Sequence, residues 1–130
     1  MEPIVVKFGG SSLATAEQFE KAAAIIHKNP ARRYIVASAP GKRSSDDTKV
    51  TDLLYRCYNS ACTGKDFMPA LTQIRQRFDC IIAQLQLQID LAADFDAIAA
   101  HLHAHGRWRC LWPRHQSSRP REIEPSALRP

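Results

Sequence analysis

The stretch Lys7-Phe8-Gly9-Gly10-Ser11-Ser12 decides how the first part of this chain is interpreted. It follows Ile4-Val5-Val6, a β-branched run that predicts a buried strand. It precedes Thr15, which can cap a helix, with Gln18 reaching back to the cap. A cation, two glycines and two hydroxyl groups are therefore predicted in a tight turn from a strand into a helix. Such a turn suits an anion, because glycine lets the backbone approach a phosphate and the first amides of a helix carry partial positive charge.

The residues of this turn suggest a role for each side chain. Lys7 supplies a full positive charge, Gly9 and Gly10 open the backbone, and the Ser11 hydroxyl can donate a hydrogen bond. The glycine spacing matches neither the P-loop nor the dinucleotide-binding fingerprint. We therefore expect a phosphate-binding turn of another kind, and the alternative is a structural turn without a ligand.

A second strand is expected close to the first. Helical spacing of apolar residues ends at Asn29-Pro30 and is followed by the strand Tyr34–Ser38. The helical positions are Phe19, Ala22, Ala23 and Ile26. A strand, a helix and a strand of this length imply a parallel pair. Ligands gather at the carboxyl ends of parallel strands, so we expect residues 7–10 and 38–41 to line one cleft.

Three further helices are predicted after a polar loop at residues 42–49. The first starts near Val50-Thr51, the second runs from Phe67 to about Leu87, and the third runs from about Asp90 to about His105. Their predicted apolar faces carry Leu53, Leu54, Cys57 and Ala61; Leu71, Ile74, Phe78, Ile81, Ile82 and Leu85; and Leu91, Phe95, Ile98 and Leu102. We interpret Cys57 and Cys80 as small hydrophobic side chains on these faces and all four cysteines as reduced.

Composition narrows the class of protein. The chain has 130 residues, 45% of them hydrophobic, which is typical of one globular domain. No run approaches the ~20 apolar residues that span a bilayer, and the start of the chain does not resemble a signal peptide. We therefore expect a cytoplasmic location.

The end of the chain differs in composition. Residues 101–130 hold six arginines against two glutamates, and both tryptophans follow Gly106. We expect residues 106–130 to be a disordered basic tail rich in Pro and Arg. The alternative is a nucleic-acid-binding arm, because basic residues meet phosphates and aromatic rings stack on bases. An out-of-frame segment gives the same composition, and we prefer that interpretation.

Three histidines near this boundary invite a metal-site interpretation. On a helix His101 and His105 would share a face, as zinc ligands can, with His103 between them. No third ligand is evident, so we predict a solvated helix end and no metal site.

Three motifs in order give the chain a family resemblance. They are Val5-Val6-Lys7-Phe8-Gly9-Gly10-Ser11-Ser12, Ala37-Ser38-Ala39-Pro40-Gly41-Lys42-Arg43 and Val50-Thr51-Asp52-Leu53-Leu54-Tyr55. With them the chain resembles the aspartate kinases of the amino-acid kinase superfamily, over about residues 4–105. The resemblance implies an α/β fold, a three-layer α/β/α sandwich with a mainly parallel sheet, present here only in part.

The resemblance also implies chemistry. The family phosphorylates the side-chain carboxylate of aspartate with ATP, the first step towards lysine, threonine and methionine. By resemblance Lys7 would neutralise the transferring phosphoryl group, Gly9 and Gly10 would cradle the ATP phosphates, and magnesium would bridge them. Residues near phosphate or aspartate would be Ser11, Ser38 and Thr51. The last two suit a strand end and a helix cap equally well, and Lys42 and Arg43 are interpreted as solvated loop charges.

The chain also departs from the family. A Ser-Arg-Gly-Glu motif that follows the corresponding helix in the family is absent, as are the later nucleotide-pocket segments and the regulatory ACT domains. We therefore expect residues 1–105 to be the first part of a kinase domain, inactive in this form, with an open sheet edge prone to self-association. The alternatives are another amino-acid kinase, such as one acting on acetylglutamate, and a non-catalytic binding protein that uses the basic tail.

Overall fold

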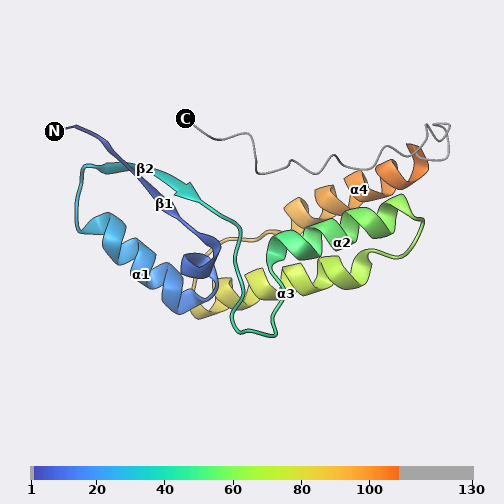
Figure 1. The fold of residues 1–130 in the computed structure, drawn as a ribbon, viewed down its shortest axis with the longest axis horizontal. Coiled ribbons are helices and arrows are strands. Elements are labelled where there is room, and N and C mark those ends of the chain that lie inside the picture. Colours follow the sequence, from blue (N-terminus) through green and yellow to red (C-terminus); the bar gives the residue numbers. More distant parts are fainter. Residues whose placement is uncertain (1, 109–130) are drawn as a thin grey trace, which may run out of the picture.

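Two parallel strands and one helix form the first part of the fold (Figure 1). The computed structural model describes residues 2–108. The elements of the first part are β1 (Ile4–Phe8), the 3₁₀ helix η1 (Gly10–Leu13), α1 (Ala16–His27) and β2 (Arg32–Ala37). The strands pair in parallel, with Val5 opposite Tyr34 and Lys7 opposite Val36. The predicted α/β class and the parallel pair are therefore confirmed.

Helix α1 begins where the sequence predicts. The hydroxyl of Thr15 accepts a hydrogen bond from the Gln18 amide at 3.4 Å and so caps the helix. Ala22 of α1 packs against Phe8 and Leu13, and the partly buried side chains around them are Val6, Phe19 and Ile26. The prediction that Ala23 shares this apolar face is wrong, because Ala23 follows Ala22 by about 100° around the helix and is exposed.

The strands are less buried than their sequences predict. Val5 is 64% exposed, Tyr34 60% and Val36 50%. Side chains alternate between the faces of a strand, and α1 covers the face that carries Phe8. The face with Val5, Lys7, Tyr34 and Val36, here called the open face, is solvent-exposed. Residues 2–108 therefore place no helical layer over the open face, and the predicted three-layer sandwich is present only in part.

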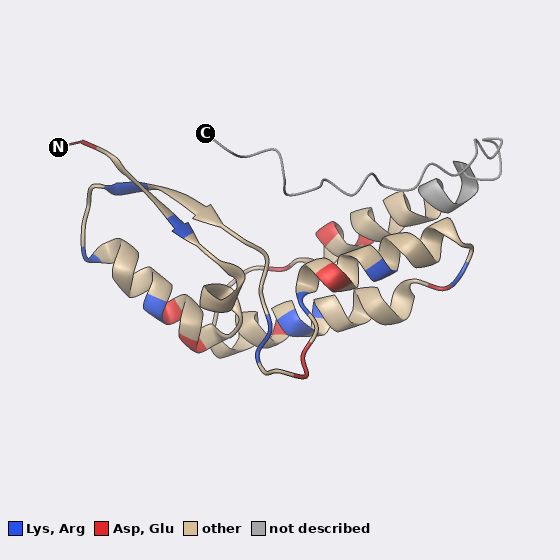
Figure 2. Ribbon diagram, viewed as in Figure 1, with Lys and Arg blue, Asp and Glu red and all other residues tan. Residues whose placement is uncertain are grey.

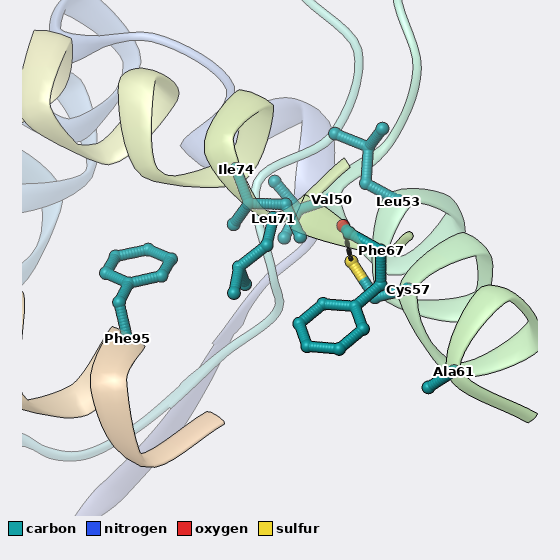
Figure 3. Packing of buried hydrophobic residues seen from close by; sticks show 8 residues of the cluster. All are labelled: Val50, Leu53, Cys57, Ala61, Phe67, Leu71, Ile74 and Phe95. Carbon is teal, nitrogen blue, oxygen red and sulfur yellow. Dashed lines mark hydrogen bonds between the residues drawn. The ribbon is translucent and has the colours of Figure 1, made fainter. Parts of the chain in front are cut away.

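Three helices form a bundle beside the sheet (Figure 1). They are α2 (Val50–Cys62), α3 (Met68–Gln84) and α4 (Ala92–Trp108), close to the predicted ranges. Their shared core is shown in Figure 3 and consists of Val50, Leu53, Cys57, Ala61, Phe67, Leu71, Ile74 and Phe95. Cys57 is fully buried, as predicted, with its sulfur 3.8 Å from the carbonyl oxygen of Phe67, and burial raises the pKa of this thiol. No helix within the described residues is long and apolar enough to cross a membrane.

Two residues predicted on the apolar faces lie in solvent instead. Leu54 is 39% exposed, and Cys80 is also exposed. Leu54 lies next to the buried Leu53, about 100° around α2. Cys80 stands in the same relation to the buried Ile81 on α3. Apolar character alone placed these side chains on the buried face, whereas the angle around the helix decides it.

Local signals set the helix ends. Gly64 adopts a positive φ of 69° just after α2, a conformation that glycine reaches without strain. The Asp66 carboxylate accepts a hydrogen bond from the Met68 amide at 2.9 Å, and the Asp90 carboxylate accepts one from the Ala92 amide at 2.8 Å. These acceptors satisfy amide groups that have no partner inside the helix.

The C-terminal end of the fold is α4. Its backbone continues to Trp108, beyond the end near His105 that the sequence predicts. The rest of the predicted basic tail, from residue 109 onward, lies outside the described residues together with Cys110. The disorder expected for residues 106–130 therefore stays a prediction for that segment.

Candidate functional site

A cleft of about 450 Å³ lies at the carboxyl ends of β1 and β2. Its walls come from the segment after each strand and from the start of α2. The lining residues are Gly10, Ser11, Ser38, Ala39, Pro40, Gly41, Lys42, Lys49 and Thr51. Four residues singled out from the sequence, Gly10, Ser11, Ser38 and Thr51, are thus brought together, although they lie up to 41 positions apart in the chain. Their role in binding stays a prediction.

Two glycines hold the cleft walls against each other. The Gly41 amide donates a hydrogen bond of 2.8 Å to the carbonyl oxygen of Gly10. A β-carbon on Gly41 would lie 2.6 Å from the carbonyl carbon of Gly10, and one on Gly10 would lie 3.0 Å from the Ala39 oxygen. The close contact between the two segments therefore requires glycine at position 41 and favours it at position 10, a reason different from the approach of a phosphate that the sequence suggested.

The turn after β1 contains a short 3₁₀ helix that the sequence does not predict. The four-residue helix η1 separates β1 from α1, and the Ser12 amide donates to the carbonyl oxygen of Gly9 at 3.0 Å. Helix α1 begins only at Ala16, which is buried. The helix η1 therefore separates the first amides of α1 from Gly9 and Gly10, and a part for these amides in anion binding stays a prediction.

Lys7 and Gly9 do not line the cleft wall. Lys7 is exposed on the open face of the sheet, and its side chain makes no hydrogen bond or ion pair within residues 2–108. A β-carbon on Gly9 would meet nothing within 4 Å, and its backbone is extended, with φ −75° and ψ 170°. Neither packing nor backbone conformation within the described residues therefore requires glycine at position 9.

Two lysines line the cleft wall, although the sequence motifs assign neither of them a role in binding. Lys49 lies immediately before α2, at its N-cap position, and was given no role. Lys42 was interpreted as a solvated loop charge; its ammonium donates to the Ser45 carbonyl oxygen at 3.1 Å. None of the residues lining the cleft carries a carboxylate. The cleft is therefore cationic, with hydroxyl donors around it. A lysine at the start of a helix beside Thr51 is the sequence signal that could have identified Lys49.

An ion-pair cluster supports one wall of the cleft. Figure 2 shows basic and acidic residues together in the segment between β2 and α2. Arg43 binds Asp47 through two side-chain hydrogen bonds of 2.8 and 3.0 Å, and its amide donates a third. Arg77 of α3 lies 3.6 Å from the same carboxylate. Arg43, chiefly by hydrogen bonding, and Arg77, by its charge, hold the pKa of Asp47 well below its usual range.

Arg77 of α3 is another residue near the cleft wall to which the sequence motifs assign no role. It is only 5% exposed and donates to the carbonyl oxygens of Gly41 at 2.5 Å and Thr48 at 2.8 Å. Burial lowers the pKa of its guanidinium, and Asp47 opposes that shift. The sequence does hold a sign that Arg77 is buried: it stands three positions after Ile74 and four before Ile81, within the apolar stripe of a helix.

One of the histidines near the end of α4, His103, contacts an aromatic ring of the bundle. The ring of His103 meets Phe67 edge-on, with centroids 4.8 Å apart, and His101 is exposed. The side chain of His105 is outside the described residues. Among the residues that the structure describes, no group of three His, Cys, Asp or Glu side chains could hold a metal ion.

Comparison with known proteins identifies relatives. No family model matches the chain. It is 47% identical over 85 residues to aspartokinase 3 of Bacillus subtilis (strain 168), a match that covers 64% of this chain and 18% of the relative. The crystal structure of Clostridium acetobutylicum aspartate kinase, described as an allosteric enzyme, superposes with a TM-score of 0.77 at 38% identity, over 80% of this chain and 24% of that one.

These two matches show how much of each known protein this chain corresponds to. The chain spans about a fifth to a quarter of the length of the proteins it matches. The sequence identity and the shared fold support homology to a part of these proteins, over most of the described residues. The chain is therefore partially homologous to the aspartokinases.

Proposed function

We propose that the cleft at the carboxyl ends of β1 and β2 binds the phosphate groups of ATP, as part of an aspartate kinase site. One observation carries the proposal: Gly10, Ser11, Ser38 and Thr51 meet around a cleft that holds two lysines and no carboxylate. Such a cleft attracts a polyanion, because charge and hydroxyl donors both complement phosphate oxygens.

Each side chain contributes to this binding by its position. Lys42 and Lys49 supply positive charge, and the hydroxyls of Ser11 and Thr51 can donate hydrogen bonds to phosphate oxygens. Ser38 follows the last residue of β2 and also lines the cleft. Lys7 stands two residues before Gly9 on the open face, and we propose that its ammonium, which has no partner within the described residues, contacts the transferring phosphoryl group.

Magnesium fits this proposal as an ion that arrives with the nucleotide. The cleft offers hydroxyl oxygens but no carboxylate. Mg²⁺ keeps several waters and is commonly held by substrate phosphates together with one or two carboxylates. Ser11, Ser38 and Thr51 are thus the residues near a bound Mg²⁺–ATP complex, where the ion would neutralise phosphate charge.

Aspartate would be the acceptor of the phosphoryl group. Its carboxylates suit the lysines, but its ammonium group requires an acidic or carbonyl partner, and no acidic side chain lines the cleft. We infer that this chain binds ATP better than aspartate. The resemblance to aspartokinases favours aspartate over acetylglutamate as the family substrate.

Calorimetric titration of the full chain with Mg²⁺–ATP tests the proposal. Lys49→Met should weaken binding roughly tenfold to a hundredfold, since a charge-assisted hydrogen bond contributes about 1.5–3 kcal/mol. Lys65→Met is the matched control, because Lys65 is an exposed lysine in the turn between α2 and α3. Equal affinity in Lys49→Met and the parent protein, or equal loss in both variants, would contradict the proposed site.

A further inference from the structure

Arg77 joins the helical bundle to the cleft wall. Its guanidinium donates to the carbonyl oxygens of Gly41 and Thr48, which stand 36 and 29 residues earlier in the chain. These carbonyls lie at the two ends of the segment 41–48, here called the wall loop. A single buried side chain therefore holds both ends of the wall loop against α3.

The contacts of the wall loop continue into the cleft. The Gly41 amide donates to Gly10, and the Val50 amide donates to the Pro40 carbonyl oxygen at 3.2 Å. Lys42 follows Gly41 directly, and Lys49 follows Thr48 directly. The two carbonyls that Arg77 holds are thus adjacent to the two lysines that line the cleft.

Packing alone does not explain why the residue at position 77 is an arginine. The buried neighbours on its face of α3 are Leu71, Ile74 and Ile81. A buried cation at such a position is costly unless it is paired, and within residues 2–108 the buried Nε of Arg77 has no hydrogen-bond partner. An apolar side chain would fill the same space without this cost. What arginine adds is a planar fork that reaches two carbonyls and a carboxylate at once.

We propose that Arg77 is a positioning residue, which holds the wall loop so that Lys42 and Lys49 face the cleft. Its effect on the loop stands on geometry alone, and its effect on ATP rests on the proposed function. Arg77 acts through Gly41, Thr48 and Asp47 and does not line the cleft itself.

Two measurements on the full chain test this role. The first is hydrogen exchange of amides in residues 41–50, compared with those of β1 and of α2 beyond its first turn. The second is calorimetric affinity for Mg²⁺–ATP. The variants are Arg77→Met, Arg77→Lys and the control Arg75→Met. Arg75 lies two residues away on α3 and is about half exposed.

Arg77→Met should speed exchange in residues 41–50 by roughly tenfold or more while β1 and α2 keep their protection, because the loss of a local anchor opens only the segment it holds. Affinity for ATP should fall roughly fivefold to tenfold. Arg77→Lys should give an exchange rate and an ATP affinity between those of the parent protein and Arg77→Met. An ammonium can reach one carbonyl oxygen, but it cannot bind both as the planar guanidinium does. Arg75→Met should match the parent protein in both measurements.

Three results would overturn the role of Arg77. They are uniform acceleration of exchange across all elements, unchanged exchange in residues 41–50, and an Arg77→Lys variant indistinguishable from Arg77→Met. If Arg77→Met unfolds at the assay temperature, Arg77→Lys is compared with Arg75→Met instead. Faster exchange confined to residues 41–50 in Arg77→Lys then supports the role, and unchanged or uniformly faster exchange overturns it. If the parent protein does not bind ATP, the proposed function fails, and the exchange pattern still decides whether Arg77 positions the wall loop.

Discussion

The Gly41 amide lies 2.8 Å from the carbonyl oxygen of Gly10, and this hydrogen bond joins the segments that follow the two strands. Both backbones approach so closely that neither position has room for a β-carbon at ordinary contact distance. Gly41 is also the residue whose carbonyl oxygen Arg77 holds. The shape of the cleft therefore depends on a backbone contact between two glycines.

Gly41→Ala should destabilise the fold, and Gly9→Ala should not. The new methyl group on Gly41 would lie 2.6 Å from the backbone of Gly10, and such overpacking typically costs about 1–3 kcal/mol. The methyl group on Gly9 would meet nothing within 4 Å. Chemical denaturation of both variants measures the difference. Equal stability of the two variants would show that the Gly10–Gly41 contact is not required.

Lys7→Ala should weaken ATP binding more than it weakens folding. Lys7 is exposed and has no side-chain partner within residues 2–108, so its removal should change stability by less than about 0.5 kcal/mol. Loss of a charge-assisted phosphate contact would cost about 1.5–3 kcal/mol in binding. Nucleotide titration and thermal melts test both parts. Unchanged nucleotide affinity would rule out a phosphate contact for Lys7.

Asp47→Asn should remove part of the stability that the fold has at neutral pH. Arg43 and Arg77 lower the pKa of Asp47 in the folded state, so its ionised form stabilises the fold above the unfolded-state pKa of about 3.9. That stabilisation begins to be lost as the pH falls below about 5, and it is lost completely only below the folded-state pKa of Asp47, which lies well under the unfolded value. We expect a loss of roughly 1 kcal/mol at pH 7, less than the about 1.5–3 kcal/mol of a charged hydrogen bond, because Arg43 is half exposed and solvent screens the pair. The variant and the parent protein should converge at low pH.

Denaturation curves at pH 7 and pH 3 measure the start of this convergence, and the difference in stability should be smaller at pH 3 than at pH 7. Asp46→Asn is the matched control, because Asp46 is the exposed neighbour in the same loop. A constant difference between Asp47→Asn and the parent protein at both pH values would mean that the ion pair does not account for the effect.

The open face should make the chain self-associate. Val5, Tyr34 and Val36 expose half or more of their surface on one side of a two-stranded sheet, and exposed apolar faces and free strand edges favour association. Sedimentation velocity over a range of concentrations should reveal oligomers. Val36→Thr combined with Val5→Thr keeps β-branched side chains and should reduce association. A monomer at all concentrations would contradict this prediction.

The full chain should not turn over aspartate at a useful rate. Phosphoryl transfer requires the donor and the acceptor to be held in line, and the cleft lacks an acidic side chain for the aspartate ammonium. A coupled assay of ADP release with aspartate and magnesium measures turnover, with Lys7→Ala as the comparison. Aspartate-dependent turnover that disappears in Lys7→Ala would overturn the prediction and show that the chain holds both substrates.

The sequence by itself determined the local elements. The Thr15 cap, the strand before Gly9 and the helix that starts at Val50 all follow from residues that lie close together in the chain. Capping and periodicity depend on neighbours within a few positions, so they can be recognised without a structure. The order of the motifs was also sufficient to indicate the kinase family that the comparisons support.

The tertiary structure decided which face of each element is covered and which charges meet. Burial of β1 on one face only, and exposure of Tyr34, depend on what packs over the sheet. Lys49 lines the same cleft as residues that follow β1, and Arg77 donates a hydrogen bond to the carbonyl oxygen of Gly41. Both contacts join segments that are far apart in the chain. Such contacts are set by the packing of whole helices and strands, and no local pattern of residues encodes them.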